Sequence, residues 1–231
     1  LVQATFDAAS RPQHTRLRYQ CSPHRTGTAL WPVIQQLSFA AGLEPDDTET
    51  TKLGKLKAML CQGREDCADA VPLVGALLGI DANAGSIEDL SPTQRRARTL
   101  TALVEQLLGL AQHQPVLMVV EDAHWIDPTT LELIGQALDR IADARVLMLI
   151  TSRPDNQPVL GKSQHLTRLV LERLSRDETK AIAAGVAGDM SLPHEVMREI
   201  AARTDGVPLF IEELTKAVLE AGAAGPQTVP P

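Results

Sequence analysis

Apolar residues follow two kinds of pattern along this chain. Continuous apolar runs occur at 116–120 (VLMVV) and within 145–151 (RVLMLIT), and such runs are typical of strands that are buried on both faces of a parallel sheet. Between these runs, from Pro128 onward, apolar residues recur at helical spacing. A strand, a helix and a second strand within about forty residues predict a βαβ unit with parallel strands and a right-handed crossover.

The remaining pattern predicts further strands and helices. Alternation at 16–22 (RLRYQCS) and the short run at 167–171 (TRLVL) each favour a strand. Leu1 to Ala9 resembles the last turns of a helix, and 81–90 is expected to be a polar loop. Helices are expected at 30–42, 50–61, 66–78 and from Ser91, where Ser91, Pro92 and Gln94 give a capping box with proline at the first helical position.

From Ser175 onward the pattern is entirely helical. Ser175 and Glu178 match a capping box, and helices are expected over 175–186, 192–204 and 208–221. The chain is therefore expected to contain an α/β domain over 1–172, with a helical insert at about 29–90, and a small all-helical domain over 173–222. The glycine- and proline-containing residues 223–231 are typical of a linker.

Composition narrows the function classes. The chain has 231 residues, a net charge of −7 and only 3% aromatic residues. Nucleic-acid binding needs a basic surface and aromatic faces for stacking, so this composition argues against it. The basic cluster Arg95, Arg96 and Arg98 is interpreted as the solvated face of a helix. No apolar run approaches the ~20 residues of a membrane span, so no membrane insertion is expected.

The cysteines predict a reducing environment. Cys21, Cys61 and Cys67 are odd in number and form no CxxC pair. This pattern favours neither a disulfide framework nor a zinc site. Other metal and nucleophile signatures, such as HExxH and GxSxG, are absent from the sequence.

Two carboxylates, Glu121 and Asp122, follow the first apolar run directly. The carboxyl ends of parallel strands border the crevice in which α/β proteins bind ligands, so this pair predicts a ligand site. A hydrophobic strand ending in acidic residues also holds magnesium against nucleotide phosphates in P-loop NTPases. The alternative is that the pair only ends a strand and caps the next turn.

Four residues near the two strand ends have candidate roles. Arg153 follows the second apolar run, and its planar guanidinium suits a phosphate, with a surface salt bridge as the alternative. Asp127 precedes Pro128 and is expected to cap a helix. Trp125 is interpreted as a packing residue between sheet and helix. His124 either contacts a phosphate or a water, or is a hydrogen-bonded loop histidine.

Three motifs stand in the order found in a known family. LMVVEDAHWIDPTTLELI resembles the Walker B region of the STAND class of P-loop NTPases, an AAA-related group. TSRP at 151–154 resembles its sensor strand, whose arginine reads the nucleotide phosphates, and GVPLFIEEL at 206–214 resembles the GxP motif of its helical module, whose proline packs near the adenine. The chain looks most like ATPase regions that follow class III adenylate cyclase domains in large bacterial proteins, often with tetratricopeptide repeats after them. Related modules occur in bacterial transcriptional regulators.

The resemblance implies a P-loop NTPase core, a parallel α/β sheet lacking its first strand, followed by a small helical lid. It implies that Glu121 and Asp122 hold Mg²⁺, that Asp122 orients or activates the attacking water, and that Arg153, Gly206 and Pro208 contact ATP. Residue 121 is glutamate where the family usually has aspartate. This difference is expected to affect ATP hydrolysis more than ATP binding.

One expected motif does not occur in this sequence. No GxxxxGK[ST] phosphate loop is present, and the resemblance places it directly upstream of Leu1.

The expected function is an ATP-binding, slowly hydrolysing switch in a larger cytoplasmic signalling protein. Its partners would be an attached cyclase or DNA-binding output domain, a repeat domain and a second copy in a homo-oligomer. The main alternative is a non-hydrolysing scaffold or interaction module, and a DNA-associated ATPase is disfavoured by the acidic charge.

Overall fold

The computed structural model describes residues 14–63, 66–81, 85–160, 165–188, 190 and 192–222. The chain divides into two compact units, Leu1–Leu166 and Thr167–Pro231, and each is considered by itself. The helix expected at 1–9 and the linker expected at 223–231 lie outside the described residues. None of the helices within these ranges combines the length and apolar character needed to cross a membrane.

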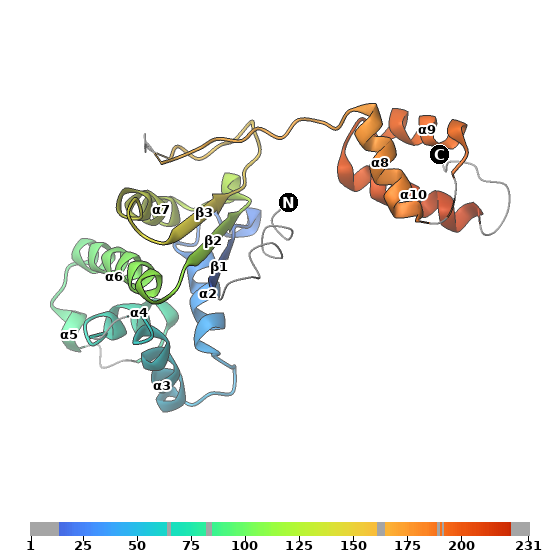
Figure 1. The fold of residues 1–231 in the computed structure, drawn as a ribbon. Coiled ribbons are helices and arrows are strands. Elements are labelled where there is room, and N and C mark those ends of the chain that lie inside the picture. The colour runs from blue at the N-terminus through green and yellow to red at the C-terminus, as the bar shows by residue number, and fades with distance from the viewer. Residues whose placement is uncertain are drawn as a thin grey trace. The chain divides into compact units, whose positions relative to one another are not determined.

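The first unit is built on a three-stranded parallel sheet (Figure 1). Its strands are β1 (Thr15–Gln20), β2 (Val116–Glu121) and β3 (Val146–Ile150), and β2 lies between the other two. Helix α7 (Pro128–Arg140) connects β2 to the parallel strand β3. The predicted βαβ unit, and with it the predicted α/β fold class, is confirmed.

The central strand explains why its sequence is continuously apolar. Val116, Met118 and Val120 point to one face and belong to the main core, which the helices of this unit share. Leu117 and Val119 point to the other face, where they are buried and pack with Leu149 of β3. Because both faces are buried, no alternation of polar residues appears until the strand ends.

The main core is completed by helices from the predicted insert at about 29–90 and by the long helix that follows it. These are α2 (Trp31–Ala41), α3 (Glu49–Leu60), α4 (Ala70–Leu78), α5 (Gly85–Glu88) and α6 (Pro92–His113). Figure 1 shows α3, α4 and α5 beyond α2 and α6, farther from the sheet. Helix α6 begins as predicted, with Ser91 and Gln94 bonding each other's backbone N–H groups. The prediction of a loop at 81–90 missed α5, a single turn too short to give a periodic signal.

A disulfide joins Cys61 to Cys67, so the prediction that the cysteines form no disulfide framework is wrong for these two residues. The two Cα atoms lie 5.4 Å apart, within the range that disulfides bridge. Cys61 follows the last turn of α3 and Cys67 precedes α4, so the chain reversal between these helices brings the cysteines together. Gly63, inside this reversal, lies against the backbone of α6 at Gln106 and Leu110.

The second unit contains α8 (Arg176–Ala187), α9 (His194–Thr204) and α10 (Pro208–Gly222). Its small core consists of Ala183, Val196, Ile200, Ile211 and Val218. The predicted capping box of Ser175 and Glu178 is confirmed by reciprocal hydrogen bonds. Helices thus begin and end in this unit close to where the pattern predicts.

The strand predicted at 167–171 does not form. Leu169, Val170 and Leu171 are instead among the most exposed apolar residues, at 80%, 72% and 74%. A strand requires a neighbouring edge to pair its N–H and C=O groups, and an apolar run alone does not supply one.

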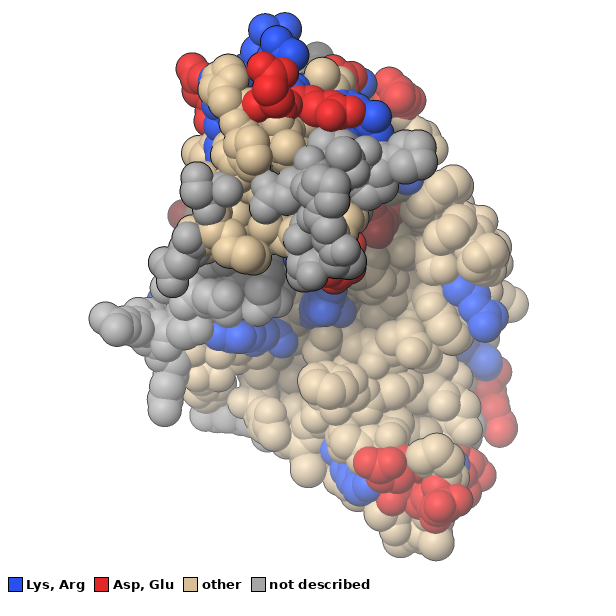
Figure 2. Space-filling model, turned by 90° about the vertical axis from the view of Figure 1, so that its right-hand side faces the viewer, with Lys and Arg blue, Asp and Glu red and all other residues tan. Residues whose placement is uncertain are grey.

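Charged side chains are mixed on the face of the molecule shown in Figure 2. Lys and Arg occur there in small groups beside Asp and Glu, separated by uncharged surface. This face therefore offers no broad basic surface among its described residues, in keeping with the acidic net charge of −7.

Candidate functional site

The candidate site lies where β2 and β3 end. Glu121 is the last residue of β2, and Asp122 follows it with a left-handed backbone, φ 55°, a conformation that aspartate tolerates better than most side chains. Two hydrogen bonds fix this turn to the end of β3. Thr151 Oγ1 accepts from Asp122 N (3.1 Å), and Thr151 O accepts from Ala123 N (2.8 Å). The acidic pair therefore projects from a turn that both strands hold.

Both carboxylates are engaged by side chains from β1. Arg18 Nε forms an ion pair with Glu121 Oε2, and Gln20 Nε2 donates to Asp122 Oδ2 (2.9 Å). Sequence reasoning missed both partners. The usable signal was the alternation in RLRYQC, which places Arg18 and Gln20 on one face of β1, while the parallel register sets Gln20 beside Glu121.

The donor chemistry of this edge fits magnesium. Mg²⁺ prefers hard oxygen ligands and is commonly bound by one or two carboxylates together with waters and substrate phosphates. Among the residues that the structure describes, no group of three or more metal-ligating side chains exists. Glu121 and Asp122 thus suit a cation that arrives with a phosphate-bearing ligand, although Arg18 already neutralises Glu121.

Arg153 lies beyond the end of β3, at the same edge of the sheet as the acidic pair. Its segment is attached to the turn after β2, because Asn156 Nδ2 donates to His124 O (3.2 Å) and Asn156 N donates to Arg153 O (3.4 Å). The side chain of Arg153 is exposed, and no carboxylate in the described part of the chain pairs with it. The surface salt bridge considered as its alternative role is therefore not formed.

His124 and Trp125 lie in the 3₁₀ turn η2 (Ala123–Trp125). Trp125 packs against the main core, as predicted. Both ring nitrogens of His124 are buried, and neither has a hydrogen-bond partner among the described residues. No hydrogen bond of the ring is seen among the described residues, so for the side chain the hydrogen-bonded loop histidine stays a prediction, while the backbone oxygen of His124 accepts from Asn156 Nδ2.

Asp127 is a helix cap, as predicted, and it has a second role. Its Oδ1 accepts from the backbone N–H groups of Thr129 (3.0 Å) and Thr130 (2.9 Å) at the start of α7. The same oxygen accepts from Leu30 N (3.1 Å), the residue before α2, and Oδ2 accepts from Thr130 Oγ1 (2.5 Å). One buried carboxylate thereby ties together the beginnings of two helices.

Cys21, the remaining cysteine, is a buried neighbour of this carboxylate network. Burial raises the pKa of its thiol to about 11, and the negative charges of Asp127 and Asp122 add to the effect. Because the thiolate is the nucleophilic form, this cysteine is unreactive at neutral pH. Cys21 therefore contributes packing, and its backbone N–H extends the sheet by bonding Glu121 O (3.0 Å).

The two remaining residues from the motif comparison, Gly206 and Pro208, belong to the second unit. Gly206 has φ +70°, and its backbone lies against that of Leu174, whose N–H donates to Gly206 O (2.9 Å). Pro208 is the exposed first residue of α10, and Leu209 and Phe210 after it are 62% and 58% exposed. Their contact with nucleotide stays a prediction.

The parallel sheet and the polar residues at its carboxyl edge are typical of one class of protein. Nucleotide-binding α/β domains have a parallel sheet and bind their ligand outside the carboxyl ends of its strands, which is where this sheet carries Glu121, Asp122 and Arg153. Residues 1–150 match the model of the family described as AAA ATPase domain, and this chain belongs to that family. The predicted resemblance to an AAA-type P-loop ATPase module is confirmed at this level.

One curated protein shows clear similarity over most of the chain. It is named "Uncharacterized protein R02095", from Rhizobium meliloti (strain 1021), and is 31% identical over 205 residues. The match covers 87% of this chain and 20% of that protein. The chain thus spans about a fifth of the length of this relative.

Proposed function

We propose that this chain is the ATP-binding, slowly hydrolysing switch module of a larger bacterial signalling protein of the STAND type. The observation that carries the proposal is the acidic pair Glu121 and Asp122, fixed at the carboxyl edge of the sheet beside Arg153, in a chain of the AAA ATPase family. Phosphoryl transfer depends mainly on positioning and charge stabilisation, and this edge carries groups suited to both.

Each side chain has a separate role in the proposal. Asp122 orients or activates the attacking water, and Glu121 and Asp122 hold Mg²⁺, which neutralises charge on the phosphates when it is bound. Arg153 binds the terminal phosphate through its planar guanidinium. In the second unit, Gly206 and Pro208 contact the nucleotide, and exposed Leu209 and Phe210 next to Pro208 offer apolar surface suited to a base.

The phosphate loop is proposed to come from a preceding segment of the same protein. The sequence contains no GxxxxGK[ST], and that motif supplies the amides and lysine that cradle phosphates. Two observations support a further strand beside β3: within the described residues β3 pairs only with β2, and Leu147 of β3 is 57% exposed. The greater length of the relative is consistent with additional segments.

The proposed domains of the full-length protein follow from the resemblance of the motifs to the STAND class. The output domain would be a cyclase or a DNA-binding domain, with a repeat domain and self-association as further features. Nucleotide can act as a switch only through different contacts in two conformations. A cytoplasmic location is proposed because ATP is supplied there. The Cys61–Cys67 disulfide is the observation against it, since structural disulfides are rare in the cytosol.

Asp122→Asn tests the proposed catalytic role. In the full-length protein we expect this change to slow ATP hydrolysis at least about tenfold, because the amide can neither accept a proton from water nor carry the negative charge. ATP binding, measured by titration calorimetry, should change less than about threefold, since Asn keeps one acceptor oxygen. Unchanged turnover in Asp122→Asn would exclude this role.

A second candidate function is a scaffold of the same fold that does not hydrolyse ATP. The observation in its favour is the ion pair of Arg18 with Glu121, which occupies a carboxylate that a hydrolysing site needs for magnesium. The two candidates differ in what removal of this arginine does.

Arg18→Gln in the full-length protein distinguishes them. If the site hydrolyses ATP, freeing Glu121 should lower the Mg²⁺ concentration needed for half-maximal turnover by about threefold or more, since an opposing cation is removed. The free energy of unfolding should change by less than about 1 kcal/mol, because the arginine side chain is 60% exposed. A scaffold would show no magnesium-dependent turnover in either protein.

A further inference from the structure

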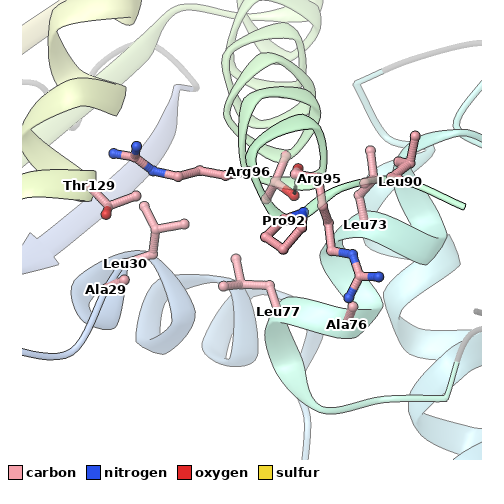
Figure 3. A pocket seen from close by; sticks show the side chains of 11 residues that line it. Ala29, Leu30, Leu73, Ala76, Leu77, Leu90, Pro92, Arg95, Arg96 and Thr129 are labelled. Carbon is pink, nitrogen blue, oxygen red and sulfur yellow. Dashed lines mark hydrogen bonds between the residues drawn. The ribbon is translucent and has the colours of Figure 1, made fainter. Parts of the chain in front are cut away.

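An apolar pocket of about 510 Å³ lies in the first unit, outside the candidate nucleotide edge. It is formed where α2, α6 and α7 begin and α4 ends (Figure 3). Leu30 precedes α2, Leu73 and Leu77 come from α4, and Thr129 comes from α7. Its volume is in the range of small-molecule sites, and a mostly apolar lining with few polar groups is typical of them.

Two arginines from the first turns of α6 border this apolar surface. In Figure 3, Arg95 extends toward Ala76, and Arg96 extends the other way, toward Thr129. Arg96 pairs with Glu132 of α7, so its charge is compensated. Arg95 donates from Nη2 to Ile87 O (3.1 Å), and no carboxylate among the described residues pairs with it. One uncompensated guanidinium therefore stands beside an apolar surface.

This combination selects the chemistry of the ligand. A guanidinium keeps its charge at all physiological pH values and binds a carboxylate through parallel N–H donors. The leucines remove apolar surface from water at about 25 cal/mol per Å². A nucleotide fits poorly, because several phosphate charges would face a single uncompensated cation and the base would find few polar partners.

We propose that this pocket binds a small amphipathic carboxylate, whose apolar chain or ring lies on Leu30 and Leu77 and whose carboxylate pairs with Arg95. The site shares no side chain with Glu121, Asp122 or Arg153. It nevertheless includes two residues, Leu30 and Thr129, whose backbone N–H groups Asp127 holds.

Decanoate is the probe for a direct test. Titration calorimetry on the full-length protein should show saturable binding of one decanoate per chain. Arg95→Gln should weaken this binding at least about tenfold through loss of the charge-assisted pair. Arg98→Gln, the same change on the same helix at a position outside the pocket, should leave it within about twofold. Leu77→Trp should abolish binding by filling the apolar surface.

Three results would each overturn the proposal. The first is no binding of decanoate by the wild-type protein at millimolar concentration, including the case in which a segment of the protein or a partner already fills the pocket. The second is equal affinity of wild type and Arg95→Gln. The third is binding of 1-decanol as tight as that of decanoate, which would show an uncharged apolar ligand. Circular dichroism checks that Leu77→Trp is folded. If that variant does not fold, the comparison of decanoate binding by Arg95→Gln and wild type still tests the proposal.

Discussion

Asp127→Ala is expected to lower the free energy of unfolding of the first unit by about 3 to 4 kcal/mol. Removing an N-cap side chain costs about 1 kcal/mol. Asp127 is only 2% exposed and also accepts from Leu30 N and from the hydroxyl of Thr130, which is fully buried. Alanine leaves these donors in the interior without a partner, and each such loss costs about 1 to 3 kcal/mol.

Tryptophan fluorescence can measure this loss of stability in the first unit. The chain has two tryptophans, Trp31 and Trp125, and both lie within Leu1–Leu166. With a urea dependence of about 2 kcal/mol per M, the fluorescence midpoint should fall by about 1.5 to 2 M. Asp127→Asn keeps the oxygen that accepts from the three backbone N–H groups and should cost about 1 kcal/mol or less.

Thr48→Ala is the control for a cap at an exposed position, where the hydroxyl also bonds that of Thr51 (2.9 Å). Thr48 caps α3 through one backbone bond, to Thr51 N (3.2 Å), at an exposed position. Its removal should cost about 1 kcal/mol. Equal losses for Asp127→Ala and Thr48→Ala would show that the bond to Leu30 adds nothing, and the connection between α2 and α7 would have to be assigned to apolar packing.

The sequence predicted those features of the site that depend on neighbours along the chain. The strand ending in Glu121, the cap at Asp127 and the helix start at Ser91 are each specified by a few consecutive residues. The βαβ order then followed, because a right-handed crossover leaves two parallel strands few other arrangements. Local chemistry and one topological rule thus placed the acidic pair at a sheet edge.

What the sequence did not predict depends on neighbours across the fold. Arg18 is 103 positions from Glu121 and Gln20 is 102 positions from Asp122, and only the strand register brings them together. The strand expected at 167–171 has residues of the right type, but no described strand pairs with it. The arginines of α6, predicted to form a solvated face, are indeed exposed, but two of them border a pocket whose other walls come from α2, α4 and α7.

Gly206→Ala is expected to destabilise the second unit by about 3 kcal/mol. At φ +70° any L side chain is strained, at a cost of about 1 to 2 kcal/mol. A Cβ at this position would also lie 2.3 Å from Leu174 O and 2.8 Å from Leu174 N. The backbone would have to move apart, and such overpacking costs about 1 to 3 kcal/mol. Among the described residues its buried core cluster has five members, so this unit has little stability to lose.

Amide hydrogen exchange of α8, α9 and α10 measures this effect, since neither tryptophan lies in the second unit. A loss of about 3 kcal/mol should speed the slowest exchange about 100-fold. Gly79→Ala has the same φ of +70° with open space around its Cβ and should destabilise the first unit by about 1 kcal/mol. Gly185→Ala, inside α8 with open space, should instead stabilise the second unit by about 0.5 to 1 kcal/mol.

Gly206→Ala also separates two explanations for the GVP sequence at 206–208. The close approach of Leu174 gives Gly206 a packing role that needs no nucleotide, whereas the motif resemblance gives it a nucleotide contact. If exchange in α8–α10 is unchanged in Gly206→Ala while the full-length protein binds ATP more weakly, the packing role is excluded. If exchange accelerates as expected, weaker ATP binding follows from unfolding of the second unit. Exposed Pro208, replaced by Ala, then becomes the residue that tests direct contact, because its loss removes no buried bond.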